Sequence, residues 1–193
     1  YREYLLRRRP EVATPGPFVD TAGRELGRHR GVAFYTIGQR QGLGLARAKP
    51  AYVVGIDVEQ NRVIVGDAEA AQAVGLLMRE VNYLSIGGLP EEGLRLAGRV
   101  RSGGALTPCV ARPEGQRVRV EFDRPEWAVS PGQAAVCYDG EAVAFGGIIE
   151  SARQTQRTLA DSARLSFKRR GENAISLFET ENQIAALSNR QEQ

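Results

Sequence analysis

Short apolar runs that repeat between residues 76 and 150 constrain the fold of this 193-residue chain more than any other feature. Each run is long enough for one β-strand, and glycine, proline and aspartate mark the turns between runs. The runs cover residues 77–85, 94–102, 105–112, 117–122, 134–138 and 141–150. Strands of this length and spacing are typical of a small antiparallel barrel. We therefore predict a mainly β (α+β) chain in which residues 74–150 form a C-terminal β-barrel.

Arginines alternate with apolar residues in two of these runs. Arg99 and Arg101 lie at a period of two in one run, and Arg117 and Arg119 do so in another. Residues at this period project from the same face of a sheet. A pair of guanidinium groups on a small barrel suits an RNA backbone, although an ordinary solvated sheet face gives the same pattern.

Residues 1–73 carry a different pattern, which predicts a small central α+β domain. Two short strands around a tight turn are expected at residues 18–20 and 25–27, and a clear hairpin at residues 51–58 and 62–65. An alanine-rich segment with an acidic start, residues 67–74, suits a short helix or a linker. We place the domain boundary there.

A glycine-rich stretch at residues 27–45 is the most unusual part of this first domain. It contains five glycines, the only histidine (His29), and three arginines: Arg28, Arg30 and Arg40. Such backbone bends sharply or approaches a partner closely, and arginines on it suit a phosphate-bearing partner. A glycine-rich turn with solvated arginines is the alternative. His29 has no neighbouring nucleophile or second ligand, so we expect a hydrogen-bonded turn or surface residue.

The charge distribution supports a polyanionic partner for the same region. The formal net charge of the chain is only +3, yet residues 1–49 hold ten basic and four acidic residues. A local excess of this kind points to an acidic polymer such as nucleic acid.

Several other classes of function lack their sequence signals. The glycine spacing fits neither the dinucleotide nor the P-loop pattern, so we expect no cofactor bound by this chain. Cys109 and Cys137 lie in apolar stretches without metal-ligand spacing, which predicts no metal site and two buried, reduced thiols. A disulfide between them stays open. We expect no membrane partner, since no apolar run reaches the length of a membrane span.

Two features near the end of the barrel remain open to more than one interpretation. Gln133 follows Ser-Pro-Gly at residues 130–132, where its amide offers both donor and acceptor groups. Trp127 suits stacking on a base or plugging the end of the barrel. Residues 151–193 are polar and suit two amphipathic helices, at residues 151–167 and 173–187, or a tail that stays mobile until it binds a partner.

Taken in order, these segments resemble the tRNA-uridine 2-sulfurtransferases, the 2-thiouridylases that act on the wobble uridine of certain tRNAs. The most specific blocks are Thr-Ile-Gly-Gln-Arg at residues 36–40 and Ser-Pro-Gly-Gln at residues 130–133. The resemblance is collinear over about residues 1–150. It implies a central domain followed by a barrel similar to those of translation factors.

The resemblance also implies what this chain lacks. The ATP pyrophosphatase loop and the catalytic cysteines of the family lie in a further domain, which adenylates uridine with ATP and magnesium and then transfers persulfide sulfur. We therefore expect a cytoplasmic piece of a longer protein, inactive by itself, with that catalytic domain and a sulfur-donor protein as partners.

Residue by residue, the family's tRNA contacts correspond to Arg99, Val100 and Gln133. Together with Arg101, Arg28, Arg30 and Arg40, these residues are expected to hold the anticodon arm of tRNA. A free-standing, non-catalytic RNA-binding or assembly module is the alternative reading. An in-frame segment with Ser-Gly-Gly-x-Asp-Ser and a cysteine just before Tyr1 would favour the enzyme, and a start codon there would favour the module.

Overall fold

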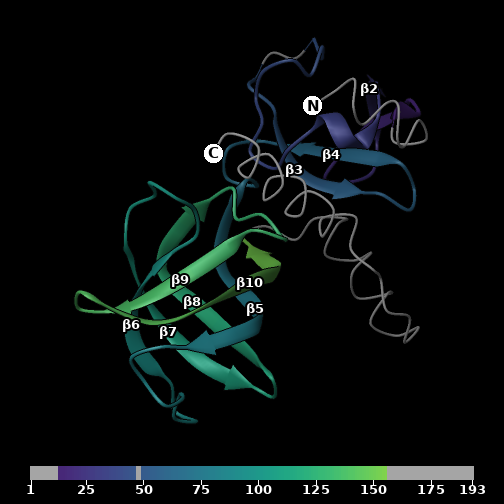
Figure 1. Ribbon diagram of the computed structural model, residues 1–193. Coiled ribbons are helices and arrows are strands. Elements are labelled where there is room, and N and C mark those ends of the chain that lie inside the picture. The colour runs from purple at the N-terminus through teal and green to yellow at the C-terminus, as the bar shows by residue number, and fades with distance from the viewer. Residues whose placement is uncertain (1–12, 47–48, 156–193) are drawn as a thin grey trace, which may run out of the picture.

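The computed structural model describes residues 13–46 and 49–155, which form a four-stranded sheet and a closed six-stranded barrel (Figure 1). Strands dominate the described residues, and the helical element among them is a short 3-10 turn, η2, at Val32–Phe34. The predicted mainly β class and the predicted barrel are both confirmed. No helix in the described part of the chain has the length and apolar character needed to cross a membrane.

The small sheet consists of two hairpins joined side by side. Its strands are β1 (Gly16–Asp20), β2 (Glu25–His29), β3 (Tyr52–Asp57) and β4 (Arg62–Gly66), in the order β2-β1-β4-β3. Both hairpins occur where the sequence predicts them. The pairing of β1 with β4 is parallel and therefore joins segments more than 40 residues apart in the sequence.

Side chains of the β3–β4 turn explain why this hairpin forms locally. Asn61 adopts a φ of 48°, in the left-handed region that asparagine tolerates better than most residues. The Asp57 carboxylate accepts a hydrogen bond from the backbone N–H of Gln60. It also forms an ion pair with Arg62, whose Nη2 lies 2.7 Å from Oδ2. One carboxylate therefore fixes both the turn and the first residue of β4.

The barrel closes by pairing its first strand with its last. Its strands are β5 (Gln72–Tyr83), β6 (Leu94–Arg99), β7 (Thr107–Glu114), β8 (Arg117–Trp127), β9 (Ala134–Asp139) and β10 (Ala142–Gln154), in the closed order β10-β5-β8-β7-β6-β9. Leu96, Val118 and Val120 point inward, as the alternation predicts, and pack with Met78 and Phe145 in one core.

Two segments differ from the sequence-based expectation. Residues 68–71 form turns and β5 begins at Gln72, so a short helix over residues 67–74 is wrong. Residues 151–154 extend β10, so the helix expected over residues 151–167 is wrong at its start. The remaining residues of both tail helices lie outside the described part of the chain.

The sheet and the barrel contact each other through a small aromatic junction. The Trp127 ring lies edge-on to Tyr52, with 5.0 Å between ring centroids. Gln154 at the end of β10 donates from Nε2 to the carbonyl oxygen of Val54 at 2.6 Å. Trp127 therefore packs against the small sheet, on the cluster that includes Val19 and Val54, and not in the barrel core as the plug interpretation expects.

Candidate nucleic-acid interface

The Thr-Ile-Gly-Gln-Arg block lies along the open edge of β3 and against the barrel. The backbone N–H of Gly38 donates to the carbonyl oxygen of Val53 at 2.8 Å, and the N–H of Val53 donates to that of Gln39 at 2.9 Å. Gly38 has a φ of 86°, and a Cβ added there would lie 2.5 Å from the Cβ of Ala128. Glycine is required at this position both for the bend and for the close approach.

His29 is a structural residue of this region. It is 1% exposed, and its ring contacts the rings of Phe18 and Tyr35, which also contact each other. Nδ1 accepts a hydrogen bond from the N–H of Gly31, so Nε2 carries the proton and donates to the carbonyl oxygen of Asn61 at 3.0 Å. Burial lowers the pKa of His29, which keeps the ring neutral. The predicted hydrogen-bonded role is confirmed, while the surface alternative is wrong.

The arginines of the glycine-rich stretch are exposed. Arg28 lies on β2, Arg30 follows it in a bend, and Arg40 lies in the loop before β3. Among the described residues, no carboxylate lies within ion-pairing distance of any of the three. Arg40 and Lys49 line a shallow hollow of about 560 Å³ together with backbone of Gly42 and Gly44.

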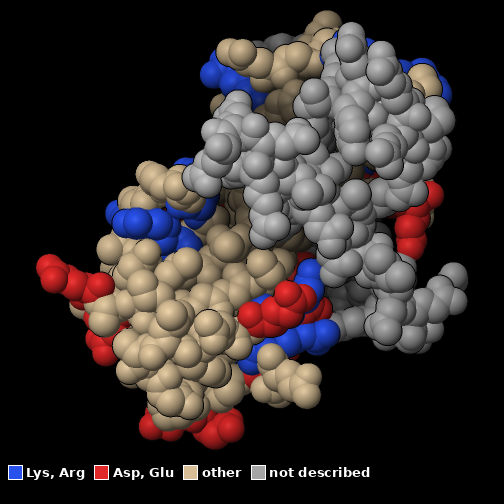
Figure 2. All heavy atoms as spheres, viewed as in Figure 1, with Lys and Arg blue, Asp and Glu red and all other residues tan. Residues whose placement is uncertain are grey.

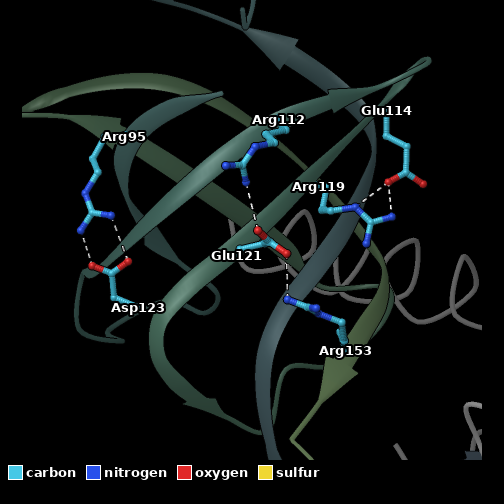
Figure 3. Close-up of polar contacts among 7 residues, drawn as sticks. All are labelled: Arg95, Arg112, Glu114, Arg119, Glu121, Asp123 and Arg153. Atoms are coloured by element: carbon cyan, nitrogen blue, oxygen red, sulfur yellow. Dashed lines mark hydrogen bonds and ion pairs between the residues drawn. The ribbon is translucent and has the colours of Figure 1, made fainter. Parts of the chain in front are cut away.

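Most arginines on the outer face of the barrel are, in contrast, paired with carboxylates (Figure 3). Glu121 accepts from Arg112 Nη1 at 3.0 Å and from Arg153 Nη2 at 2.9 Å. Three further pairs are Arg95 with Asp123, Arg119 with Glu114, and Arg117 with Glu150. The basic face predicted from Arg117 and Arg119 is therefore neutralised by acids that lie far away in sequence or across a turn.

Within the described part of the barrel, the end of β6 carries unpaired positive charge, as does the exposed Arg124 on β8. Arg99 is partly buried, and Arg101 is exposed in the turn that follows. No described carboxylate lies within ion-pairing distance of either guanidinium group. The side chain of Val100 is only 5% exposed and packs in the barrel core. The strand alternation turns this side chain inward, so only the backbone of Val100 faces the barrel surface.

The strand register brings Gln133 to the same end of the barrel. β6 and β9 are antiparallel, with Arg99 opposite Val136, so the chain beyond Arg99 runs alongside the chain before Val136. The Gln133 side chain is exposed, while the backbone carbonyl oxygen of Gln133 accepts from the backbone N–H of Ile149 at 2.8 Å. We call Arg99, Arg101 and Gln133 the barrel-end group.

The structure thus divides the expected contact residues between two places. The barrel-end group lies at the end of β6, in the turn after it and before β9, while Arg28, Arg30 and Arg40 lie on the small sheet and its loop. In the view of Figure 2, Lys and Arg atoms lie on the small sheet and on the upper part of the barrel, while Lys and Arg atoms lie beside Asp and Glu atoms lower on the barrel.

Sequence reasoning missed Tyr138, which lies next to Arg99. The guanidinium carbon of Arg99 is 5.5 Å from the centroid of the Tyr138 ring. The two residues are 39 positions apart, and only the pairing of β6 with β9 brings them together. Nothing local in the sequence signals this contact.

The two cysteines are free and buried, as the sequence predicts. Cys109 of β7 lies opposite Leu96 of β6 and Cys137 of β9 lies opposite Gly98, and the thiols hydrogen-bond to each other. That hydrogen bond and burial both raise the pKa of the Cys137 thiol, which makes it a poor nucleophile at neutral pH. Among the described residues, no group of three metal-ligating side chains could hold a metal ion.

Comparisons with known proteins match both parts of the chain. Residues 2–67 match the family model described as the tRNA methyl transferase PRC-barrel domain, and residues 73–149 match the aminomethyltransferase beta-barrel domain. Similar proteins include the tRNA-specific 2-thiouridylase MnmA of Moorella thermoacetica, which is 48% identical over 80% of this chain. The proteins of the same name from Symbiobacterium thermophilum and Acetivibrio thermocellus are 46% and 44% identical over 79% and 78% of the chain.

The matched segment is only part of each relative. It covers 43%, 39% and 42% of the lengths of these three proteins. The chain therefore spans about two-fifths of the curated relatives it matches.

Proposed function

Because the chain belongs to the tRNA-specific 2-thiouridylase family, we propose that it provides a tRNA-binding surface of such an enzyme. The names of its relatives identify tRNA as their substrate, and the charge distribution of this chain suits the same polyanion. Phosphate contacts of arginine supply much of the affinity of proteins for nucleic acids.

The observation that carries the proposal is the contrast between paired and unpaired arginines. Arg95 and Arg99 lie on the same strand, yet Arg95 is paired with Asp123 and Arg99 has no acidic partner among the described residues. The carboxylate of a paired guanidinium neutralises its charge and occupies some of its N–H donors, whereas an unpaired guanidinium contributes its full charge. Arg99, Arg101 and Gln133 are therefore the proposed contacts on the barrel.

The small sheet is the second part of the proposed surface. Arg28, Arg30 and Arg40 are exposed and unpaired among the described residues, and Arg40 borders the hollow next to Lys49. A folded RNA such as the anticodon arm of tRNA is large enough to touch both places. Val100 contributes only backbone to this surface, since its side chain lies in the core.

The chemistry of the family belongs, in this proposal, to the part of the relatives outside the matched segment. ATP-dependent adenylation of the wobble uridine and transfer of persulfide sulfur need a nucleotide site and a reactive thiol. The described residues of this chain offer only two buried thiols, Cys109 and Cys137. A catalytic domain and a sulfur-donor protein are the proposed partners, and the cytoplasm is the proposed location.

Binding of an in-vitro-transcribed tRNA to the 193-residue chain tests this proposal. We expect measurable affinity that falls steeply with salt, because arginines displace counterions from phosphates. Arg99→Ala should weaken binding several-fold, at about 1–3 kcal/mol per good contact. Arg95→Ala is the matched control on the same strand and should leave affinity within about twofold. Binding that ignores salt, or that Arg95→Ala weakens as much as Arg99→Ala, would contradict the proposal.

A further inference from the structure

We propose that Tyr138 is a positioning residue, which holds the guanidinium group of Arg99 in place for an RNA phosphate. This inference rests on the proposed function, because it names the support of one proposed tRNA contact. Nothing in the sequence-based reasoning or in the family matches assigns a role to Tyr138.

The pairing of β6 with β9 places the two side chains on one face of the barrel wall. Tyr138 lies opposite Ala97, and Ala97 and Arg99 share a face because they are two residues apart. Tyr138 and Arg99 are therefore diagonal neighbours, within reach for long and aromatic side chains. The distance of 5.5 Å between the guanidinium carbon and the ring centroid lies in the range of cation–π contacts.

The other groups around Arg99 do not fix its position. Its Nε is buried and has no hydrogen-bond partner among the described residues, and no described carboxylate pairs with it. Arg95 lies on the same strand and the same face, on the other side of Ala97, and two contacts to Asp123 hold it in place (Figure 3). Within the part of the chain that the structure describes, the Tyr138 ring is the contact that takes the place of a carboxylate.

This support suits a phosphate oxygen as the ligand. A ring holds a guanidinium group through its face and leaves the terminal N–H groups at its edge available. These donors match the oxygens of a phosphodiester. An arginine placed in advance also loses less side-chain freedom when RNA binds, so that more of the contact energy appears as affinity.

The test is a double-mutant cycle on the full 193-residue chain, with an in-vitro-transcribed tRNA titrated at several salt concentrations. Tyr138→Leu should weaken binding about three- to tenfold, the range that loss of a cation–π contact allows. It should also flatten the salt dependence toward that of Arg99→Ala, because one phosphate contact is lost. Tyr138→Phe keeps the ring and should stay within about twofold of the wild type. The double variant Arg99→Ala/Tyr138→Leu should bind no more weakly than Arg99→Ala.

Several results would overturn the inference while leaving the proposed function intact. They are normal binding by Tyr138→Leu alongside weak binding by Arg99→Ala, full additivity in the cycle, and an unchanged salt dependence in Tyr138→Leu. Tyr138→Val, which keeps a strand-forming residue, replaces the leucine variant if that variant does not fold. If the wild-type chain does not bind tRNA, or if Arg99→Ala binds normally, the proposed function itself fails and the inference fails with it.

Discussion

His29 shows, at the scale of a single residue, how burial decides what a side chain does. The ring is neutral, buried against two aromatic rings, and hydrogen-bonded through both nitrogens. Protonation would add a proton to Nδ1, which already accepts a hydrogen bond, so it would break that bond inside the core. The small sheet is therefore most stable when the His29 ring is neutral.

Stability should fall as the pH falls below about 6.5, the ordinary pKa of histidine. Burial lowers the pKa of His29 in the folded chain. As the pH falls, the histidine of the unfolded chain is therefore protonated before that of the folded chain. The free energy of unfolding from urea titrations should thus be larger at pH 7.5 than at pH 5.5. His29→Gln should remove most of this difference, because the chain has no other histidine. An equal pH dependence in the variant would contradict this role.

The residue scale is also where the sequence predicts least. Strand alternation correctly turns Leu96 inward and Arg95 and Arg99 toward the outer face. It cannot say which of the two arginines meets a carboxylate, since Asp123 is 28 positions from Arg95. The same limit hides Tyr138 from a sequence-based search. Side-chain partners across a barrel depend on strand order, which local patterns do not contain.

At the scale of elements, the barrel strands constrain individual glycines more than the turns do. Gly75 lies on β5 beside the irregular part of its pairing with β8. A Cβ at this position would lie 2.6 Å from the carbonyl oxygen of Val120, which is backbone and cannot move aside. Gly87, in contrast, has no heavy atom within 4 Å of its position for a Cβ.

Gly75→Ala should therefore destabilise the barrel by about 1–3 kcal/mol, the usual cost of overpacking. Gly87→Ala is the matched control and should change stability by less than about 0.5 kcal/mol. Thermal or urea unfolding of the two variants measures the difference. Equal stability of the two variants would show that the β5–β8 pair adjusts more easily than its backbone contacts indicate.

Elements are the level at which sequence reasoning succeeds best here. Both hairpins of the small sheet and all six barrel strands are predictable, because alternation and turn residues are local signals. The failures are at segment ends. Residues 68–71 have a helix-like alanine composition, yet they turn so that β5 can begin at Gln72. Residues 151–154 look polar and helical, yet β10 continues because β5 is long enough to pair with it.

For the whole molecule, the contact between the sheet and the barrel is the feature that most needs a particular residue. Gly38 and Gly44 both have positive φ angles, 86° and 67°, so alanine is strained at either position. Only at Gly38 would a Cβ also collide with the barrel, at 2.5 Å from the Cβ of Ala128. The difference between the two substitutions isolates the cost of pushing the sheet away from the barrel.

Gly38→Ala should be more destabilising than Gly44→Ala by about 1–3 kcal/mol. The emission of Trp127, the only tryptophan, gives a second measurement, because its ring packs on Tyr52 at this junction. A shift of that emission to longer wavelength in Gly38→Ala, but not in Gly44→Ala, is expected if the junction opens. Matching spectra and matching stabilities would contradict the role of Gly38 as a spacer between the two units.

Closure of the barrel through β5 and β10 has a consequence for synthesis on the ribosome. β5 is the first barrel strand to be synthesised, and one of its two partners is β10. This pair can form only when β10 has left the ribosome, about 70 residues later. Until then β5 and β9 each present an open edge, which invites pairing with other chains. The small sheet contains all of its own partners by Gly66, so it can fold ahead of the barrel during translation.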